Sequence, residues 1–106
     1  MAETETVNTV IERGLDYLRK RIRIEAAYLF GSQLTGEANE ESDIDLAVFS
    51  PDAGNMSLAE RIRLGSELAL DCSLDLELHL YSSRALANAC PTNFAGYIIA
   101  HGRRLI

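Results

Sequence analysis

The stretch YLFGSQLTGEANEESDIDLAVF, residues 28–49, decides the fold. A largely apolar run at 24–30 ends at a glycine, a second apolar run occupies 44–49, and small polar residues separate the two. Short apolar runs bounded by turn signals are typical of buried strands. We therefore predict two strands, at 24–30 and 44–49, joined by a loop at 31–42.

Helices and one further strand are predicted on both sides of this stretch. Residues 4–21 repeat apolar side chains every three or four positions, as one face of a helix does. Ser57 and Glu60 have the spacing of a capping box, so a helix should begin there, with an inward face that includes Leu58 and Ile62. The elements predicted outside the central stretch are helices at 4–21, 57–71, 83–89 and 91–101 and a strand at 74–81.

The order of these elements predicts the fold class. Residues 74–81 alternate leucine with polar residues, which is the period of a strand with one apolar and one polar face. The helix at 57–71 has a suitable length to join this strand to the strand at 44–49 as a crossover between parallel neighbours. We predict an α/β (α+β) fold with a small mixed β-sheet flanked by helices, in a single domain spanning 1–106.

Composition and charge exclude several classes of protein. The chain is 47% apolar and 25% charged, as soluble globular proteins are, and no apolar run reaches the ~20 residues of a membrane helix. Its polar, acidic beginning is unlike a secretory signal, which predicts a cytoplasmic location. The net charge of −6 argues against direct DNA binding, and basic groups such as 19–23 should be solvated. Cys72 and Cys90 lack metal-ligand spacing and should be free thiols.

Two features at the ends of the predicted strands point to a chemical site. Gly31-Ser32 directly follows a strand, where a glycine lets the backbone approach a ligand and free N–H groups suit a phosphate. Asp43 and Asp45 begin the next strand, and the alternation of side chains places both carboxylates on one face. Two aspartates this close repel each other unless a cation lies between them, and Mg²⁺ prefers such oxygen ligands.

A third feature is the polar face of the last predicted strand, which carries Asp75, Glu77 and His79. If this strand lies beside the strand of Asp43, one of its two carboxylates can complete the metal site. Three carboxylates could then hold two metal ions about 4 Å apart. His79 and His101 are expected to be surface or partly packed residues that take no part in the site.

The string GSQLTGEANEESDIDLAVF at 31–49 resembles the signature of the polymerase-beta-like nucleotidyltransferases, which is Gly-Ser, a spacer and Asp-x-Asp. The order of elements along nearly the whole chain is similar to that of the minimal nucleotidyltransferases, and this implies a nucleotidyltransferase fold. The resemblance also implies an enzyme in which Gly31 and Ser32 hold the triphosphate and Asp43 and Asp45 are catalytic metal ligands. ATP would be the nucleotide donor, and two Mg²⁺ ions would be the cofactors.

The same resemblance places the third catalytic metal ligand at Glu77. Family members often end this strand with an apolar residue or tyrosine followed by threonine or serine, and Tyr81-Ser82 matches that pattern without a gap. Asp75 is the alternative, because aspartate is the commoner residue at the site. The implied reaction transfers a nucleoside monophosphate to a hydroxyl group and releases pyrophosphate.

The resemblance further implies a partner. Minimal nucleotidyltransferases often accompany an all-helical HEPN protein, and the toxin–antitoxin versions neutralise a HEPN ribonuclease by adenylylating it. Two other interpretations remain open. The chain could be a module that binds nucleotide weakly and neutralises its partner by complex formation, since many relatives carry basic residues where this chain has Gln33, Leu34 and Thr35. Alternatively, it could be a small-molecule nucleotidyltransferase that acts as a homo-oligomer.

Overall fold

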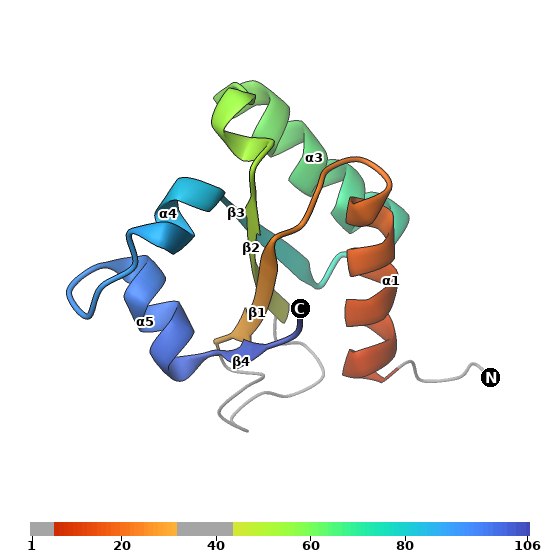
Figure 1. The fold of residues 1–106 in the computed structure, drawn as a ribbon. Coiled ribbons are helices and arrows are strands. Elements are labelled where there is room, and N and C mark those ends of the chain that lie inside the picture. Colours follow the sequence, from red (N-terminus) through yellow and green to blue (C-terminus); the bar gives the residue numbers. More distant parts are fainter. Residues whose placement is uncertain (1–5, 32–43) are drawn as a thin grey trace.

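The fold is a mixed sheet of four strands with helices on both faces (Figure 1). The computed structural model describes residues 6–31 and 44–106. In chain order the elements are α1 (Val7–Arg19), β1 (Ala26–Phe30), β2 (Ile44–Ser50), the 3₁₀ helix η1 (Ala53–Asn55), α3 (Leu58–Asp71), β3 (Leu76–Ser82), α4 (Ser83–Ala87), α5 (Phe94–His101) and β4 (Arg103–Arg104).

The strands follow the order β3-β2-β1-β4 across the sheet. β1 is antiparallel to β2, whereas β2 and β3 are parallel and α3 connects them. The predicted mixed sheet and the predicted helical crossover between parallel neighbours are therefore confirmed. β4, which pairs antiparallel with β1, is an addition to the predicted elements. Its two arginines carry no apolar alternation, so the sequence pattern does not indicate this strand.

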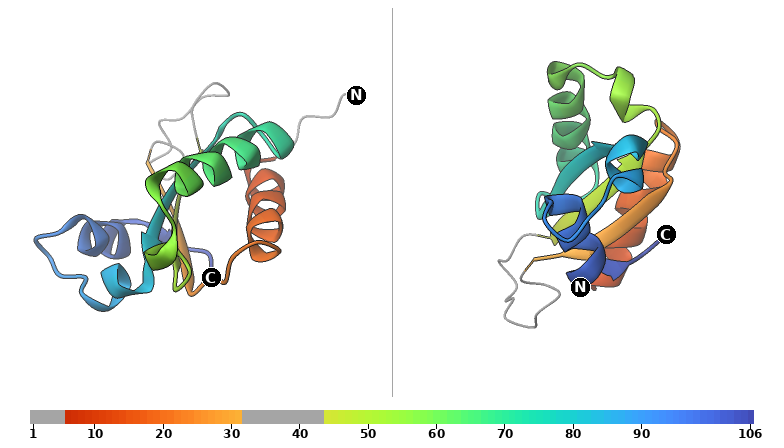
Figure 2. Two further views of the ribbon diagram at one scale, coloured as in Figure 1. Left: turned by 90° about the horizontal axis from the view of Figure 1, so that it is seen from above. Right: turned by 60° about the vertical axis from the view of Figure 1, so that its left-hand side comes forward.

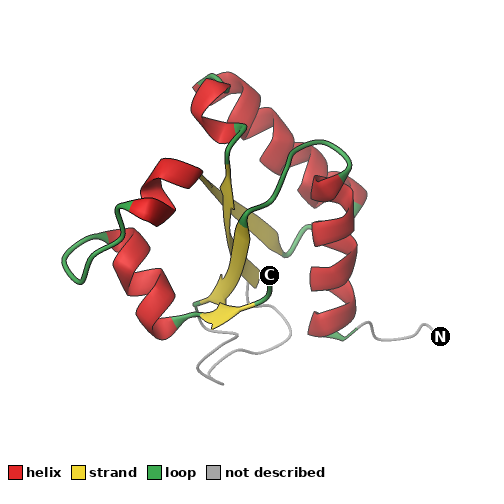
Figure 3. Ribbon diagram, in the orientation of Figure 1, coloured by secondary structure: helices red, strands yellow, loops and turns green. Residues whose placement is uncertain are grey.

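Each face of the sheet has its own hydrophobic core, because successive strand residues point to opposite sides. Figures 1 and 3 show the sheet between two pairs of helices, with α1 and α3 on one side and α4 and α5 on the other. The view from above in Figure 2 shows the same layers. The largest fully buried side chains on the α1 and α3 side are Leu18, Leu46, Val48 and Leu68. The buried residues on the α4 and α5 side are Ala26, Tyr28, Ala47, Phe49 and Ile98.

Helix α3 begins at the predicted capping box. The Ser57 side chain accepts from the Glu60 N–H at 3.1 Å, and the Glu60 carboxylate accepts from the Ser57 N–H at 2.7 Å. The second bond lowers the pKa of the Glu60 carboxyl. These two bonds fix the position at which the helix starts.

The predicted inward face of α3 is wrong at its beginning. Leu58 and Ile62 are 73% and 60% exposed, and the helix instead buries Leu64 and Leu68. The reason is Arg61, which occupies the sheet-facing position of the first turn. Its guanidinium donates to the Leu80 carbonyl at 3.3 Å and to the Ala53 carbonyl at 2.6 Å. An arginine that satisfies two carbonyl oxygens rotates the apolar residues beside it toward solvent.

The structure also tests smaller expectations. β3 begins at Leu76 and not at Leu74, because a turn at Ser73 precedes it. Cys72 and Cys90 are free, as predicted. Burial raises the pKa of the Cys72 thiol, and a hydrogen bond with Thr92 lowers that of the Cys90 thiol. Among the described residues, every helix is too short or too polar to span a membrane.

Candidate active site

Parallel pairing of β2 and β3 brings two carboxylates together. The register places Asp45 directly opposite Glu77, on the face of the sheet that also carries Ala47 and Phe49. His79 lies two residues further along β3 on the same face. Ligand atoms of Asp45, Glu77 and His79 all lie within 4.8 Å of one another, which makes this group a candidate metal centre.

His79 holds the carboxylate of Asp45 in place. Its Nε2 lies 3.2 Å from Asp45 Oδ1 and 3.8 Å from Glu77 Oε1. The Asp45 and His79 side chains are 22% and 28% exposed, whereas Glu77 is 53% exposed. Phe30 packs edge-on against the His79 ring, with 5.0 Å between the ring centroids. The site therefore has a partly buried, oriented carboxylate beside one that faces solvent.

Gly31 directly follows β1 and lies next to the Asp45 carboxylate. Phe30 is the register partner of Asp45, so the next residue reaches the Asp45 carboxylate. Gly31 has φ of 90°, a conformation that other residues rarely adopt. A Cβ atom at this position would also collide with Asp45 Oδ2. Both backbone conformation and space thus require glycine next to the carboxylate.

We expect Gly31→Ala to damage the site and the fold together. The left-handed conformation should cost about 1–3 kcal/mol of unfolding free energy, and the added methyl group should displace the Asp45 carboxylate. Urea unfolding gives the first effect, and titration with ATP and Mg²⁺ gives the second. Gly54→Ala is the matched control, since the nearest atom to its new Cβ, on Ser82, is 4.0 Å away. Equal tolerance of the two substitutions would contradict the assigned role of Gly31.

The predicted site residues fall into three groups. Gly31 lies next to the Asp45 carboxylate, and Asp45 lies directly opposite Glu77. Ser32 and Asp43 lie outside the described residues. Asp75 precedes β3, is exposed, and pairs through its backbone carbonyl with the Ile44 N–H at 2.7 Å. It is not one of the three residues whose ligand atoms converge.

The contact of His79 with Asp45 was not predicted. Sequence reasoning predicted a surface or partly packed histidine, and the structure confirms partial packing. The available signal was its position on the polar face of β3, two residues after Glu77. Diagonal neighbours on adjacent strands lie within reach of long or aromatic side chains, so this pairing could have been expected.

The residues present fit a hard divalent cation. Two carboxylates at adjacent positions repel each other unless a cation or proton donor lies between them. Mg²⁺ takes oxygen ligands and is often bound by one or two carboxylates together with substrate phosphates. Asp45 and Glu77 supply such oxygens. Because Gly31 has no side chain, its backbone can lie next to the Asp45 carboxylate.

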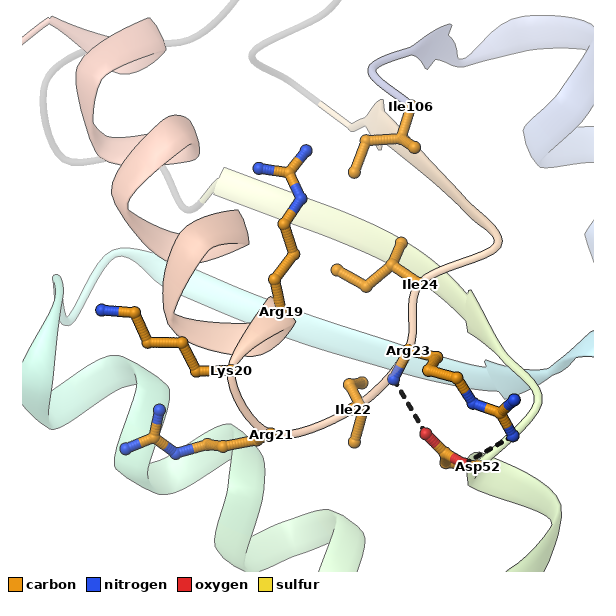
Figure 4. Close-up of a pocket in the computed structure, with 8 residues that line it drawn as sticks. All are labelled: Arg19, Lys20, Arg21, Ile22, Arg23, Ile24, Asp52 and Ile106. Atoms are coloured by element: carbon orange, nitrogen blue, oxygen red, sulfur yellow. Dashed lines mark hydrogen bonds and ion pairs between the residues drawn. The ribbon is translucent and has the colours of Figure 1, made fainter.

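A separate basic pocket lies at the other end of β1 and β2. It has a volume of about 510 Å³ and is lined by Arg19, Lys20, Arg21, Ile22, Arg23, Ile24, Asp52 and Ile106 (Figure 4). The Arg23 backbone N–H donates to the Asp52 carboxylate at 2.8 Å and lowers its pKa, and the Arg23 guanidinium lies 3.2 Å from it. Arg19 pairs with Asp16 at 2.9 Å. The arginines are exposed, in agreement with the expected solvated terminus of a helix.

Comparison with known proteins identifies the class. Residues 13–106 match the family model described as polymerase beta, nucleotidyltransferase. The chain therefore belongs to the polymerase-beta nucleotidyltransferase family, and the resemblance drawn from residues 31–49 is confirmed. No curated protein sequence matches the chain significantly.

Solved structures similar to the chain come from toxin–antitoxin complexes. A chain in a toxin–antitoxin complex with AMP-PNP is 27% identical, with a TM-score of 0.65 over 95% of this chain and 73% of that one. A chain in the complex of the tri-AMPylated Shewanella oneidensis HEPN toxin with its MNT antitoxin is 25% identical. Its TM-score is 0.63, over 93% of this chain and 71% of that one. A chain in the MntA–HepT toxin–antitoxin complex is also 25% identical, with a TM-score of 0.61 over 93% of this chain and 71% of that one.

Proposed function

We propose that the chain transfers AMP from ATP to a hydroxyl group of a HEPN-domain partner protein and thereby acts as the antitoxin of a toxin–antitoxin pair. The observation that carries the proposal is the pair of Asp45 and Glu77 carboxylates, side by side on parallel strands next to Gly31. The similar complexes support it, because one contains AMP-PNP and another a tri-AMPylated HEPN toxin. The net charge of −6 favours a basic protein surface over RNA as the partner.

Asp43, Asp45 and Glu77 are the residues that would hold two Mg²⁺ ions, and Gly31 with Ser32 would hold the triphosphate. Bound divalent ions lower the pKa of an attacking hydroxyl and stabilise a leaving pyrophosphate. The chain contributes orientation: His79 fixes one carboxylate, and the positive φ of the glycine brings the backbone close to it. Catalysis then depends mainly on positioning and charge neutralisation.

The reaction exchanges one phosphorus–oxygen bond for another. The acceptor oxygen forms a bond to the α-phosphorus, and the bond from that phosphorus to the pyrophosphate oxygen breaks. The hydroxyl proton passes to a carboxylate. Glu77 is suited to accept it, because 53% of its side chain is exposed to solvent, where an incoming hydroxyl can reach it. Asp75, which is also exposed, is the alternative acceptor.

A second candidate function is neutralisation by complex formation alone. Gln33, Leu34 and Thr35 stand where many members of the family carry basic residues, and fewer positive charges near the phosphates would weaken nucleotide binding. In this case the chain would cover its partner without modifying it. Both proposals treat residues 1–106 as one domain that acts in the cytoplasm. A small-molecule acceptor held between copies of the chain is the third possibility.

The test compares two labels on the same nucleotide. The chain is incubated with Mg²⁺, a candidate HEPN-domain partner, and ATP labelled at either the α- or the γ-phosphate. AMP transfer predicts α-label on the partner, no γ-label, and one pyrophosphate released per modified hydroxyl. Reactions without the chain and reactions with EDTA are the controls. A partner that stays unlabelled while it co-elutes with the chain would favour neutralisation by complex formation.

A further inference from the structure

An aromatic surface continues from the candidate active site along the same face of the sheet. Phe30 contacts the His79 ring at 5.0 Å and the Phe94 ring at 5.9 Å between centroids. Phe94 is followed by Tyr97 at 6.1 Å, with the two ring planes only 7° apart. We call Phe30, Phe94 and Tyr97 the aromatic platform. It begins next to Asp45, since Phe30 and Asp45 are register partners.

The outer rings of the platform face solvent. Phe94 is 48% exposed and Tyr97 is 53% exposed, although α5 buries Ile98 completely. Single exposed apolar residues are normal on a protein surface. Two neighbouring exposed rings beside a polar site instead form a contiguous apolar patch, which is typical of a binding surface. Parallel exposed rings offer the flat surface on which a planar ligand stacks.

The platform is held in place from beneath. Phe94 rests on Tyr81 at 6.2 Å and on Phe30, so its ring is fixed from two strands. Asn93 anchors the start of α5: its side-chain oxygen accepts from the Gly96 N–H at 2.8 Å and from the Cys90 N–H at 3.2 Å. A ligand that stacks here would therefore meet rings that are already ordered.

We propose that the aromatic platform stacks the nucleobase of the donor nucleoside triphosphate. The inference rests on the proposed function, which places the phosphates at Gly31 and the carboxylates of Asp45 and Glu77. A nucleotide bound there has its base one ribose away from the α-phosphate. Phe30, the register partner of Asp45, begins an aromatic surface next to these carboxylates, and Phe94 continues it. Stacking on aromatic side chains suits any base, because every base has a π-face.

A nucleobase fits the platform better than a protein surface does. A stable protein interface covers about 800 Å² on each partner, and its core is a broad apolar patch. The platform instead exposes two rings, and the His101 ring packs against Tyr97 with 4.6 Å between the ring centroids. This size and shape match one planar ring system.

The test is calorimetric titration of the chain with ATP and Mg²⁺, beside the same titration with inorganic tripolyphosphate, which has no base. Phe94→Leu and Tyr97→Leu keep apolar bulk and remove one ring each. We expect each to weaken ATP binding about ten-fold, within the range for one lost stacking contact, and to leave tripolyphosphate binding unchanged. Tyr97→Phe keeps the ring, so this variant should bind ATP with wild-type affinity. Ile99→Ala, a ringless position on the same helix, is the matched control.

The outcomes separate the inference from the proposed function. Wild-type affinity for ATP in both leucine variants would overturn the platform and leave the nucleotidyltransferase proposal standing. Equal loss of ATP and tripolyphosphate binding would also overturn it, because the rings would then support the phosphate site. Lost association with the HEPN partner at unchanged ATP affinity would assign the rings to a protein contact. A wild-type chain that binds neither ATP nor tripolyphosphate with Mg²⁺ would remove both proposals.

Discussion

Replacing Asp45 with asparagine should lower the rate of AMP transfer by about 10³-fold or more while the fold stays intact. Asparagine keeps the shape of the side chain but removes the negative charge that attracts a divalent cation. The side chain is 22% exposed, so a neutral amide at this position carries no burial penalty that would unfold the chain. The measurement is the initial rate of α-label transfer to the partner, with circular dichroism as the check on folding.

Two further variants, Glu77→Gln on β3 and Asp75→Asn just before it, test whether the loss of activity is specific to the candidate metal centre. Glu77→Gln should reduce transfer to a similar extent, because Glu77 is the register partner of Asp45 and belongs to the same candidate metal centre. Asp75→Asn makes the same chemical change outside that group and should leave the rate within about two-fold of wild type, as surface substitutions usually do. A severe loss in Asp75→Asn with an active Glu77→Gln would move the third carboxylate to Asp75.

Phe49→Ala should destabilise the chain more than any surface change, by about 3–5 kcal/mol of unfolding free energy. Phe49 lies on β2, is fully buried, stacks on Tyr81 at 5.4 Å and meets the edge of Tyr28 at 6.1 Å. Its removal would leave a cavity between the sheet and the helices α4 and α5. Since domains of this kind are stable by only about 5–15 kcal/mol, this loss would remove a large share of the total unfolding free energy.

Urea unfolding at constant pH measures this effect, and Leu70→Ala provides the control. Leu70 lies on α3 and is 75% exposed, so its truncation should change the unfolding free energy by less than about 0.5 kcal/mol. Similar losses in the two variants would mean that the α4 and α5 side of the sheet is not a packed core.

Patterns with strong physical causes were predictable from the sequence. The capping box at Ser57 located α3, and the two-residue period of the strand at 74–81 placed Glu77 on its polar face. Because a helix separates this strand from that of Asp45, parallel pairing followed, and with it the meeting of the two carboxylates. The candidate site was predictable as far as it depends on strand alternation and connection length.

Features that depend on three-dimensional contacts were not predictable. The hydrogen bonds of Arg61 to two distant carbonyl groups decide which side of α3 faces the sheet, and no local pattern signals them. Phe94, Tyr97, Ile98 and Ile99 on α5 are all large and apolar, yet among them only Ile98 is buried. Phe94 and Tyr97 instead stack on each other at the surface. The contact of His79 with Asp45 likewise requires the register of two strands that are distant in the chain.

The parallel pairing of β2 and β3 also determines when during synthesis the site can exist. Asp45 and Glu77 are separated in the chain by the whole of α3, and parallel strands pair only after the connection between them has been made. Such long-range contacts form late, because the entropy of closing the loop is lost before the contact is gained. A nascent chain that ends within α3 therefore carries Gly31 and Asp45 without their partner carboxylate. The pair of carboxylates on which the proposed function depends is complete only when β3 has left the ribosome and joined the sheet.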